Sequence, residues 1–113
     1  MRVSTPKFIQ GVFSFNGAGL DKAERLASFT VAADRRAQPV YFRAGNSSSD
    51  LIVLSVTQNG ETMRYFPVGA KSAEHVPLTV TEDILPETRI DVSVAAPAGV
   101  SGTVVFDFGL VEV

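Results

Sequence analysis

The chain has 113 residues, of which 45% are hydrophobic and 19% charged, and it carries a formal net charge of -2. This length and composition predict one globular domain, residues 1–113, that can bury a core of its own. The chain contains no cysteine, which excludes disulfides, thiolate metal sites and a cysteine nucleophile. Its basic residues are scattered, with only Arg35 and Arg36 adjacent, so no nucleic acid partner is expected.

The hydropathy of the chain argues against a membrane partner. No segment approaches the roughly 18 consecutive apolar residues that span a bilayer. Residues 1–13 also lack the uninterrupted apolar run of a signal peptide. We therefore expect a soluble, cytoplasmic protein, unless a leader precedes this sequence.

Apolar and polar side chains alternate along most of the chain, with the period of two that is typical of strands. The first such run places Ile9, Phe13 and Phe15 on one side and ends at Asn16 and Gly17, a turn signal. The strands predicted in this way span residues 7–15, 28–33, 40–44, 51–58, 61–68, 75–80, 89–94 and 103–113. About eight short strands separated by turn signals predict an all-β, antiparallel β-sandwich that is jelly-roll-like.

Residues 19–28 are the main exception to this pattern. The segment is rich in helix-forming residues, and Leu20, Ala23 and Ala27 would share one side of a helix. Because a helix of under three turns is marginal, a short helix and an irregular loop are both open here. Residues 81–87 have room for a single helical turn. The predicted fold therefore contains at most one short helix.

Residues 51–68 predict a β-hairpin. Asn59 and Gly60 suit the two positive-φ positions of a type I′ turn, which sets Gln58 opposite Glu61. The other pairs follow from that register. The core face would then hold Ile52, Leu54, Val56, Met63, Tyr65 and Pro67. The polar face would hold Leu51, Val53, Phe66 and Val68 near its open end, so we expect another element to cover it.

One predicted strand contains a proline. Pro77 lies within the predicted strand 75–80, which favours an edge position.

The first and last strands are apolar on both faces, although only one face of each sheet meets the core in a two-sheet sandwich. The surplus apolar side chains need cover, and a second copy of the chain or another protein subunit is the expected partner. The predicted interface residues are Phe8, Val12, Val53, Phe66, Val105, Val111 and Val113.

Catalytic and metal-binding residues are not predicted. His75 is the only histidine, so both a histidine metal site and a Ser-His-Asp triad lack the groups they need. The loop 46–50 is a weak candidate for calcium because it has one acidic residue and no EF-hand spacing. The glycine-rich segment 16–21 follows a strand but lacks the spacing of a phosphate-binding loop, and is interpreted as a plain turn. No cofactor is expected.

Asp107 is the one acidic residue with apolar neighbours on its own face, and we expect it to pair with Arg89 or Arg64 across the sheet. Tyr41 and Arg43 lie on the outer side of their strand and are the predicted ligand contacts. In a chain with no Trp, Tyr41 is the only plausible platform for a sugar ring.

Three functions are weighed against each other. The favoured hypothesis is a non-catalytic β-sandwich that acts through protein–protein interfaces, as an accessory, assembly or structural subunit and as a homo-oligomer. The alternative is a module that binds a small ligand or a carbohydrate. An enzyme is the third reading, and it is disfavoured because a metal-dependent β-barrel enzyme needs several histidines.

Overall fold

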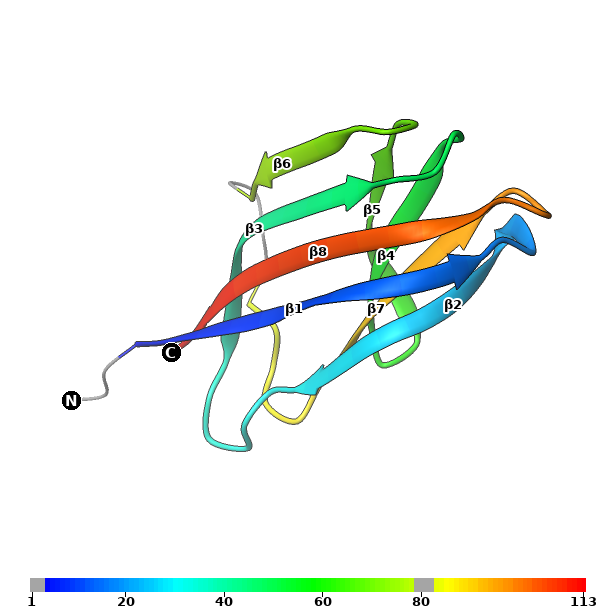
Figure 1. Ribbon diagram of the computed structural model, residues 1–113. Coiled ribbons are helices and arrows are strands. Elements are labelled where there is room, and N and C mark those ends of the chain that lie inside the picture. The colour runs from blue at the N-terminus through cyan, green and yellow to red at the C-terminus, as the bar shows by residue number, and fades with distance from the viewer. Residues whose placement is uncertain (1–3, 79–82) are drawn as a thin grey trace.

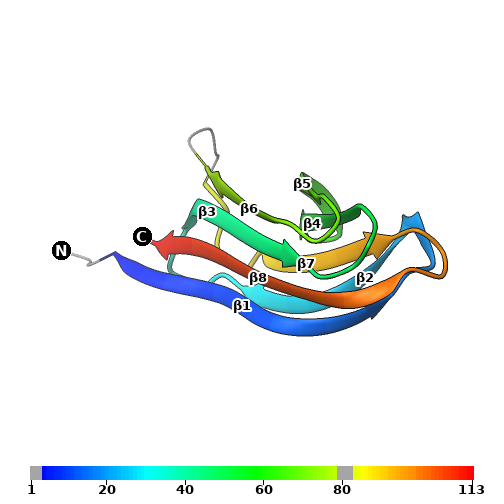
Figure 2. The same cartoon turned by 45° about the horizontal axis from the view of Figure 1, so that its top comes forward.

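The computed structural model describes residues 4–78 and 83–113, which form eight antiparallel strands and no helix. The strands are β1 (Thr5–Asn16), β2 (Gly19–Thr30), β3 (Ala37–Asn46), β4 (Ile52–Gln58), β5 (Glu61–Val68), β6 (Ala73–Pro77), β7 (Arg89–Ala96) and β8 (Ser101–Glu112). Sheet A has the strand order β1-β8-β3-β6 and sheet B the order β2-β7-β4-β5. Figure 1 shows sheet A in front of sheet B, and Figure 2 shows the two layers after a turn of the molecule. The predicted antiparallel β-sandwich is confirmed.

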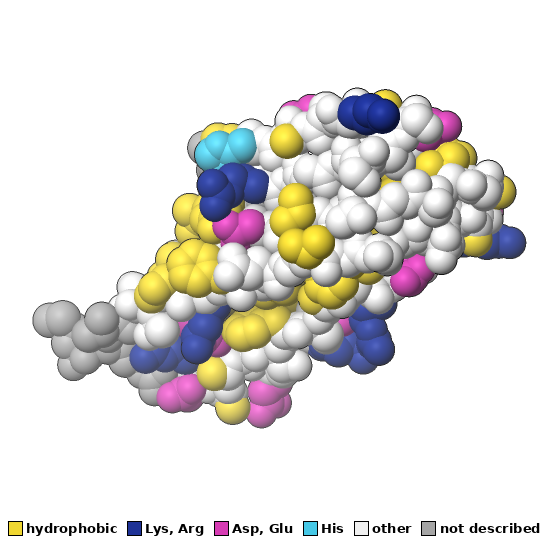
Figure 3. Space-filling model, in the orientation of Figure 1, with side chains coloured by type: hydrophobic (Ala, Val, Ile, Leu, Met, Phe, Trp, Pro, Cys, Tyr) yellow, Lys and Arg dark blue, Asp and Glu magenta, His cyan; other side chains and the backbone are white. Residues whose placement is uncertain are grey.

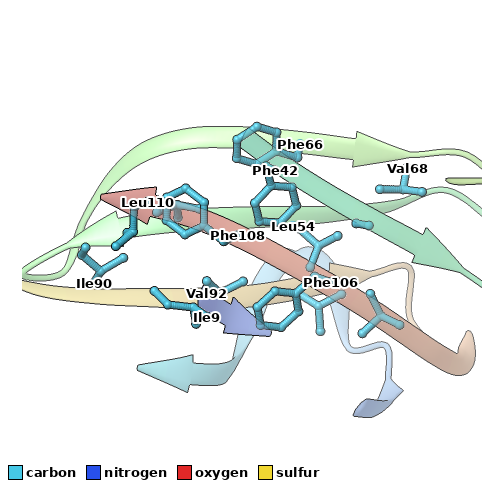
Figure 4. Close-up of a cluster of buried hydrophobic side chains, with 14 of the residues drawn as sticks. Ile9, Phe42, Leu54, Phe66, Val68, Ile90, Val92, Phe106, Phe108 and Leu110 are labelled. Carbon is cyan, nitrogen blue, oxygen red and sulfur yellow. The ribbon is translucent and has the colours of Figure 1, made fainter. Parts of the chain in front are cut away.

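The core lies between the two sheets and contains several stacked aromatic rings. Phe42 on β3 stacks on Phe66 on β5, with ring centroids 4.1 Å apart, and this contact joins sheet A to sheet B. Phe106 on β8 stacks beside Phe42 at 6.1 Å. Figure 4 shows these rings packed among aliphatic side chains from both sheets. Burial of side chains of this size supplies most of the free energy that favours folding.

Residues 19–28 belong to strand β2, so the expected helix or loop is wrong. β2 pairs with β7 along most of its length, with two register shifts. Leu26, Ala27 and Phe29 pack partly buried against the core. Helix propensity is a weak preference, and a neighbouring strand that offers hydrogen bonds and a buried face overrides it.

The hairpin of β4 and β5 has the predicted turn but not the predicted register. Asn59 and Gly60 have φ angles of 48° and 87°, as a type I′ turn requires. The register then shifts between Thr57 and Val56, so that Met63 becomes an extra residue in β5. Beyond this bulge, Val56 faces Arg64 instead of Met63.

The bulge reverses the faces of the two aromatic residues that follow it. Phe66 is in the core with 4% exposure, and Tyr65 is at the surface with 66% exposure. The sequence prediction had these two residues on the opposite faces. A shift of one residue inverts every later side chain, because strand side chains alternate.

Two sequence predictions concern the segment that follows β5, a strand that contains Pro77 and a helical turn at 81–87. β6 is an edge strand of sheet A and contains Pro77, as predicted. It spans 73–77, and residues 79 and 80 of the predicted strand 75–80 lie outside the described part of the chain. Of the proposed helical turn at 81–87, residues 81 and 82 lie outside the described part of the chain. The described remainder, 83–87, is not helical, and Ile84 forms an isolated bridge with Ala37. Within the described ranges no helix is long and apolar enough to cross a membrane.

Candidate functional site

The outer face of sheet A is the candidate site, and its side chains form three rows that run across the four strands. The alternate side chains, such as Ile9, Phe42 and Phe106, point into the core. We call the rows, in the strand order β1, β8, β3, β6, the aromatic rung, the polar rung and the valine rung. They consist of Phe8, Gly109, Tyr41 and Pro77; Gln10, Asp107, Arg43 and His75; and Val12, Val105, Gly45 and Ala73.

The polar rung is organised around Asp107. Arg43 Nη2 lies 2.6 Å from Asp107 Oδ2 and forms a charged hydrogen bond with it. The hydroxyl of Tyr41 donates to the same oxygen at 2.9 Å. The expected partners Arg89 and Arg64 are therefore wrong, because β8 lies between β1 and β3 in sheet A while these two arginines belong to sheet B.

Tyr41 connects the aromatic rung to the polar rung. Its ring covers Gly109, where a Cβ atom would collide with the ring. The guanidinium of Arg43 lies 5.1 Å from the ring centroid, and the His75 ring meets Tyr41 edge-on at 6.0 Å. Burial and the hydrogen bond to Asp107 raise the pKa of Tyr41, and the same carboxylate raises the pKa of Arg43. The two predicted ligand contacts are thus already engaged within the chain.

The two apolar rungs expose large hydrophobic side chains. Phe8 is 57% exposed, Val12 70% and Val105 47%. Gly45 and Ala73 have little or no side chain, and beside them lies a hollow of about 440 Å³ that Arg43, His75, Val105 and Asp107 help to line. Figure 3 shows this face, with hydrophobic groups on both sides of the charged ones.

The predicted interface residues fall in different places. Phe8, Val12 and Val105 lie together on the outer face of sheet A. Val111 and Val113 are half-buried near the end of β8. Three of the seven predicted interface residues thus expose apolar surface on the outer face of sheet A, while other large hydrophobic residues, such as Leu20, Tyr65 and Leu85, are exposed elsewhere.

The other two predicted interface residues are not on this face. Val53 is half-buried on the outer side of sheet B, between core residues of β4. Phe66 is in the core against Phe42, so its assignment to the surface is wrong. The Met63 bulge, which has no signature in the sequence, accounts for the error.

Sequence reasoning missed the structural role of Asn46, which is 4% exposed. Its Nδ2 donates to the carbonyl oxygens of Asp50, Val68 and Gly69 at 2.8, 3.3 and 3.1 Å. Its Oδ1 accepts from the backbone and side chain of Ser48. The loop 46–50 is therefore held by one amide. Among the described residues, no group of three His, Asp or Glu side chains is placed to hold a metal ion.

No family model and no curated protein sequence matches this chain. Several solved structures share its fold, among them the following three. PirA is 8% identical, with 88% of this chain and 92% of that chain covered, at a TM-score of 0.62. A Bacillus endospore appendage from a family of disulfide-linked pili is 9% identical, with 97% and 89% covered, at 0.54.

The third structure is that of infectious bursal disease virus, strain Gx, which is 15% identical at a TM-score of 0.50. The match covers 97% of this chain but only 31% of the viral one. At these identities the likenesses establish the fold alone. The β-sandwich of this chain thus also occurs in a pilus and in a virus.

Proposed function

We propose that this chain is a non-catalytic β-sandwich subunit that assembles with copies of itself through the outer face of sheet A. The observation that carries the proposal is the exposure of Phe8, Val12 and Val105 on one face of one sheet. Val12 and Val105 are cross-strand neighbours, and Phe8 lies on the other side of the polar rung. Exposed apolar groups rimmed by polar residues mark interaction sites in folded proteins. Most soluble oligomers consist of identical subunits, which makes a second copy the first partner to test.

The size of the face is adequate for a specific contact. The molecule measures 50 × 23 × 22 Å. A broad face of this size is large enough to bury roughly 800 Å² per partner, as standard protein interfaces do. A charged rung between two apolar rungs also agrees with the mixed composition of such interfaces.

The likeness to a pilus structure and to a virus structure supports an assembly role. The pili are disulfide-linked, whereas this chain has no cysteine. Contacts between its copies would therefore not include disulfide bonds. The use of Asp107 to bind both Tyr41 and Arg43 supports a binding surface over a catalytic one.

Static light scattering at rising protein concentration tests the proposal. We expect a mass that is a multiple of the 12.1 kDa of one chain. A constant mass of one chain up to the highest attainable concentration would contradict the proposal.

The hollow beside Arg43 favours a second function, the binding of a small ligand such as a sugar. Its volume of about 440 Å³ is within the range of ligand pockets. Calorimetry with a panel of sugars tests this function, with His75→Ala, which changes a residue that lines the hollow, as the variant that should weaken binding. If no sugar in the panel gives a heat of binding, sugar binding is ruled out as a function of this hollow.

A further inference from the structure

The two halves of the outer face of sheet A have opposite shapes along the valine rung. On β1 and β8, Val12 and Val105 project from the surface, with 70% and 47% of each residue exposed. On β3 and β6, Gly45 and Ala73 leave the hollow described above. Protruding and recessed positions therefore lie on opposite sides of a line that runs between β8 and β3.

The polar rung divides along the same line. Asp107 lies on β8 and Arg43 on β3, as direct neighbours across the strands. In these two rungs, the side with β1 and β8 carries the protruding valines and the carboxylate, and the side with β3 and β6 carries the hollow and the guanidinium. The aromatic rung has the reverse order across the line, since Gly109 lies on β8 and Tyr41 on β3. A surface with this pattern is complementary to itself after a rotation of 180° about that line.

We infer that the partner of this face is a second copy, related by a two-fold axis that runs parallel to the strands between β8 and β3. The inference rests on the proposed function and adds the arrangement of the two copies. This rotation places β1 over β6 and β8 over β3, and each rung meets itself. Val12 then lies opposite Ala73 of the second copy, and Val105 lies opposite its Gly45. Sheets that pack face to face keep their strands within about 30° of each other, as this arrangement requires.

Charge favours this axis over the other two-fold axis in the plane of the face. The chosen axis sets Asp107 of each copy opposite Arg43 of the other. An axis perpendicular to the strands would set Asp107 against Asp107 and Arg43 against Arg43. Juxtaposed like charges oppose association. The perpendicular axis would also place Val12 opposite Phe8, which allows the two arrangements to be distinguished.

Cysteine cross-linking tests the inference, because the natural chain has no cysteine to react in the background. The variants are Val12→Cys and Ala73→Cys, both at exposed positions where folding should be unaffected. They lie on the two edge strands of sheet A, about 14 Å apart within one chain. Each variant chain carries a single cysteine, so any cross-link must join two copies. Because facing sheets lie about 10 Å apart and a disulfide requires Cα atoms within about 7 Å, the cross-linking reagent is a short bismaleimide.

We expect a mixture of the two variants, treated with the bismaleimide, to give a linked dimer of about twice the 12.1-kDa chain mass. Neither variant alone should give it, because the rotation puts the two copies of position 12 at opposite edges. Tyr65→Cys, exposed on sheet B, mixed with Ala73→Cys is the control for random collision. Cross-linking of Val12→Cys with Phe8→Cys instead would overturn the inference in favour of the perpendicular axis.

The outcomes for the two proposals can be separated. If light scattering shows an oligomer and the Val12→Cys and Ala73→Cys mixture does not cross-link, the arrangement is wrong and the proposed self-assembly stands. If light scattering shows one chain only, the proposed self-assembly itself fails.

Discussion

The ring of Tyr41 on β3 occupies the space in front of Gly109, its cross-strand neighbour on β8. A Cβ atom at position 109 would meet three ring atoms of Tyr41 at impossible distances. The ring can therefore lie flat on the sheet, and its hydroxyl reaches Asp107 at 2.9 Å. The absence of a side chain at Gly109 thus leaves room for the Tyr41 ring and lets its hydroxyl reach Asp107, around which the polar rung is organised.

Gly109→Ala should lower the free energy of unfolding by about 1–3 kcal/mol, because the new methyl group forces the ring of Tyr41 to move. In a Tyr41→Ala background the same substitution should be neutral or stabilise by about 0.5 kcal/mol, since glycine is unfavourable within a strand. Denaturant unfolding of the four proteins in this double-mutant cycle measures the difference. Equal effects in the two backgrounds would show that the ring and the glycine are not coupled.

Tyr41 should make stability depend on pH in alkaline solution. Its pKa in the folded protein is raised above the usual value of 10.0 by burial and by the Asp107 hydrogen bond. The protonated phenol is the stabilising form, so its contribution is present below about pH 10 and is lost as the pH rises through the raised pKa. Tyr41→Phe should cost about 1 kcal/mol at neutral pH, and this difference from the natural protein should shrink above about pH 10. Denaturant unfolding curves of the two proteins at several pH values measure this difference in stability. A difference that stays constant across pH 10 would contradict the prediction.

Asn46→Ala should destabilise the protein by about 1–3 kcal/mol, because three carbonyl groups lose the amide that binds them. Asn46→Asp should be worse, since a carboxylate oxygen would face those carbonyl oxygens. Ser49→Ala in the same loop is the control, as an exposed residue whose change should be within about 0.5 kcal/mol. Similar midpoints of thermal unfolding for Asn46→Ala and Ser49→Ala would refute the structural role of the amide.

Arg89→Ala should cost more than the loss of an ordinary surface ion pair. Its partner Asp91, 3.2 Å away, has a side chain only 8% exposed. Arg89 Nε donates to Asp91 Oδ2, and among the described residues Asp91 Oδ1 has no hydrogen-bond partner. Loss of the arginine would leave a buried charge without a cation, at a cost of about 1–3 kcal/mol. The Arg36–Asp83 pair is much more exposed, with 56% and 34% of the two side chains accessible, so Arg36→Ala should cost under about 1 kcal/mol. Denaturant unfolding measures the loss of stability in each variant. Equal losses for Arg89→Ala and Arg36→Ala would contradict the stronger role given to the Arg89–Asp91 pair.

The period of hydrophobicity predicts most of the strands, because each sheet has one face in the core and one outside. The Asn59–Gly60 turn and the edge position of Pro77 also follow from local chemistry, positive φ in one case and a missing backbone donor in the other. These features depend on residues close together in the sequence.

The features that sequence reasoning missed depend on neighbours in space. The helix formers of residues 19–28 become a strand because β7 is available to pair with them. The bulge at Met63 exchanges the faces of Tyr65 and Phe66, and it places a second phenylalanine on Phe42 in the core. Packing across the sandwich decides such a register, and the hairpin alone does not contain that information.

The candidate site was predictable in part. The surplus of apolar side chains on β1 and β8 indicated Phe8, Val12 and Val105, and the structure gathers these three on one face. The pairing of Arg43 with Asp107 was not predictable, because it requires β8 to lie next to β3. The hollow beside Gly45 and Ala73 was also not predicted, because it too depends on which strands are neighbours in sheet A.

Sedimentation equilibrium of the natural chain beside Val105→Asp and Tyr65→Asp tests most directly whether the outer face of sheet A joins copies of the protein. Both substitutions put a charge at an exposed hydrophobic position, one on sheet A and one on sheet B. The account predicts that the natural chain and Tyr65→Asp sediment as the same oligomer, while Val105→Asp sediments as a single chain. An oligomer that survives in Val105→Asp, or a natural chain that is already a monomer, would contradict it.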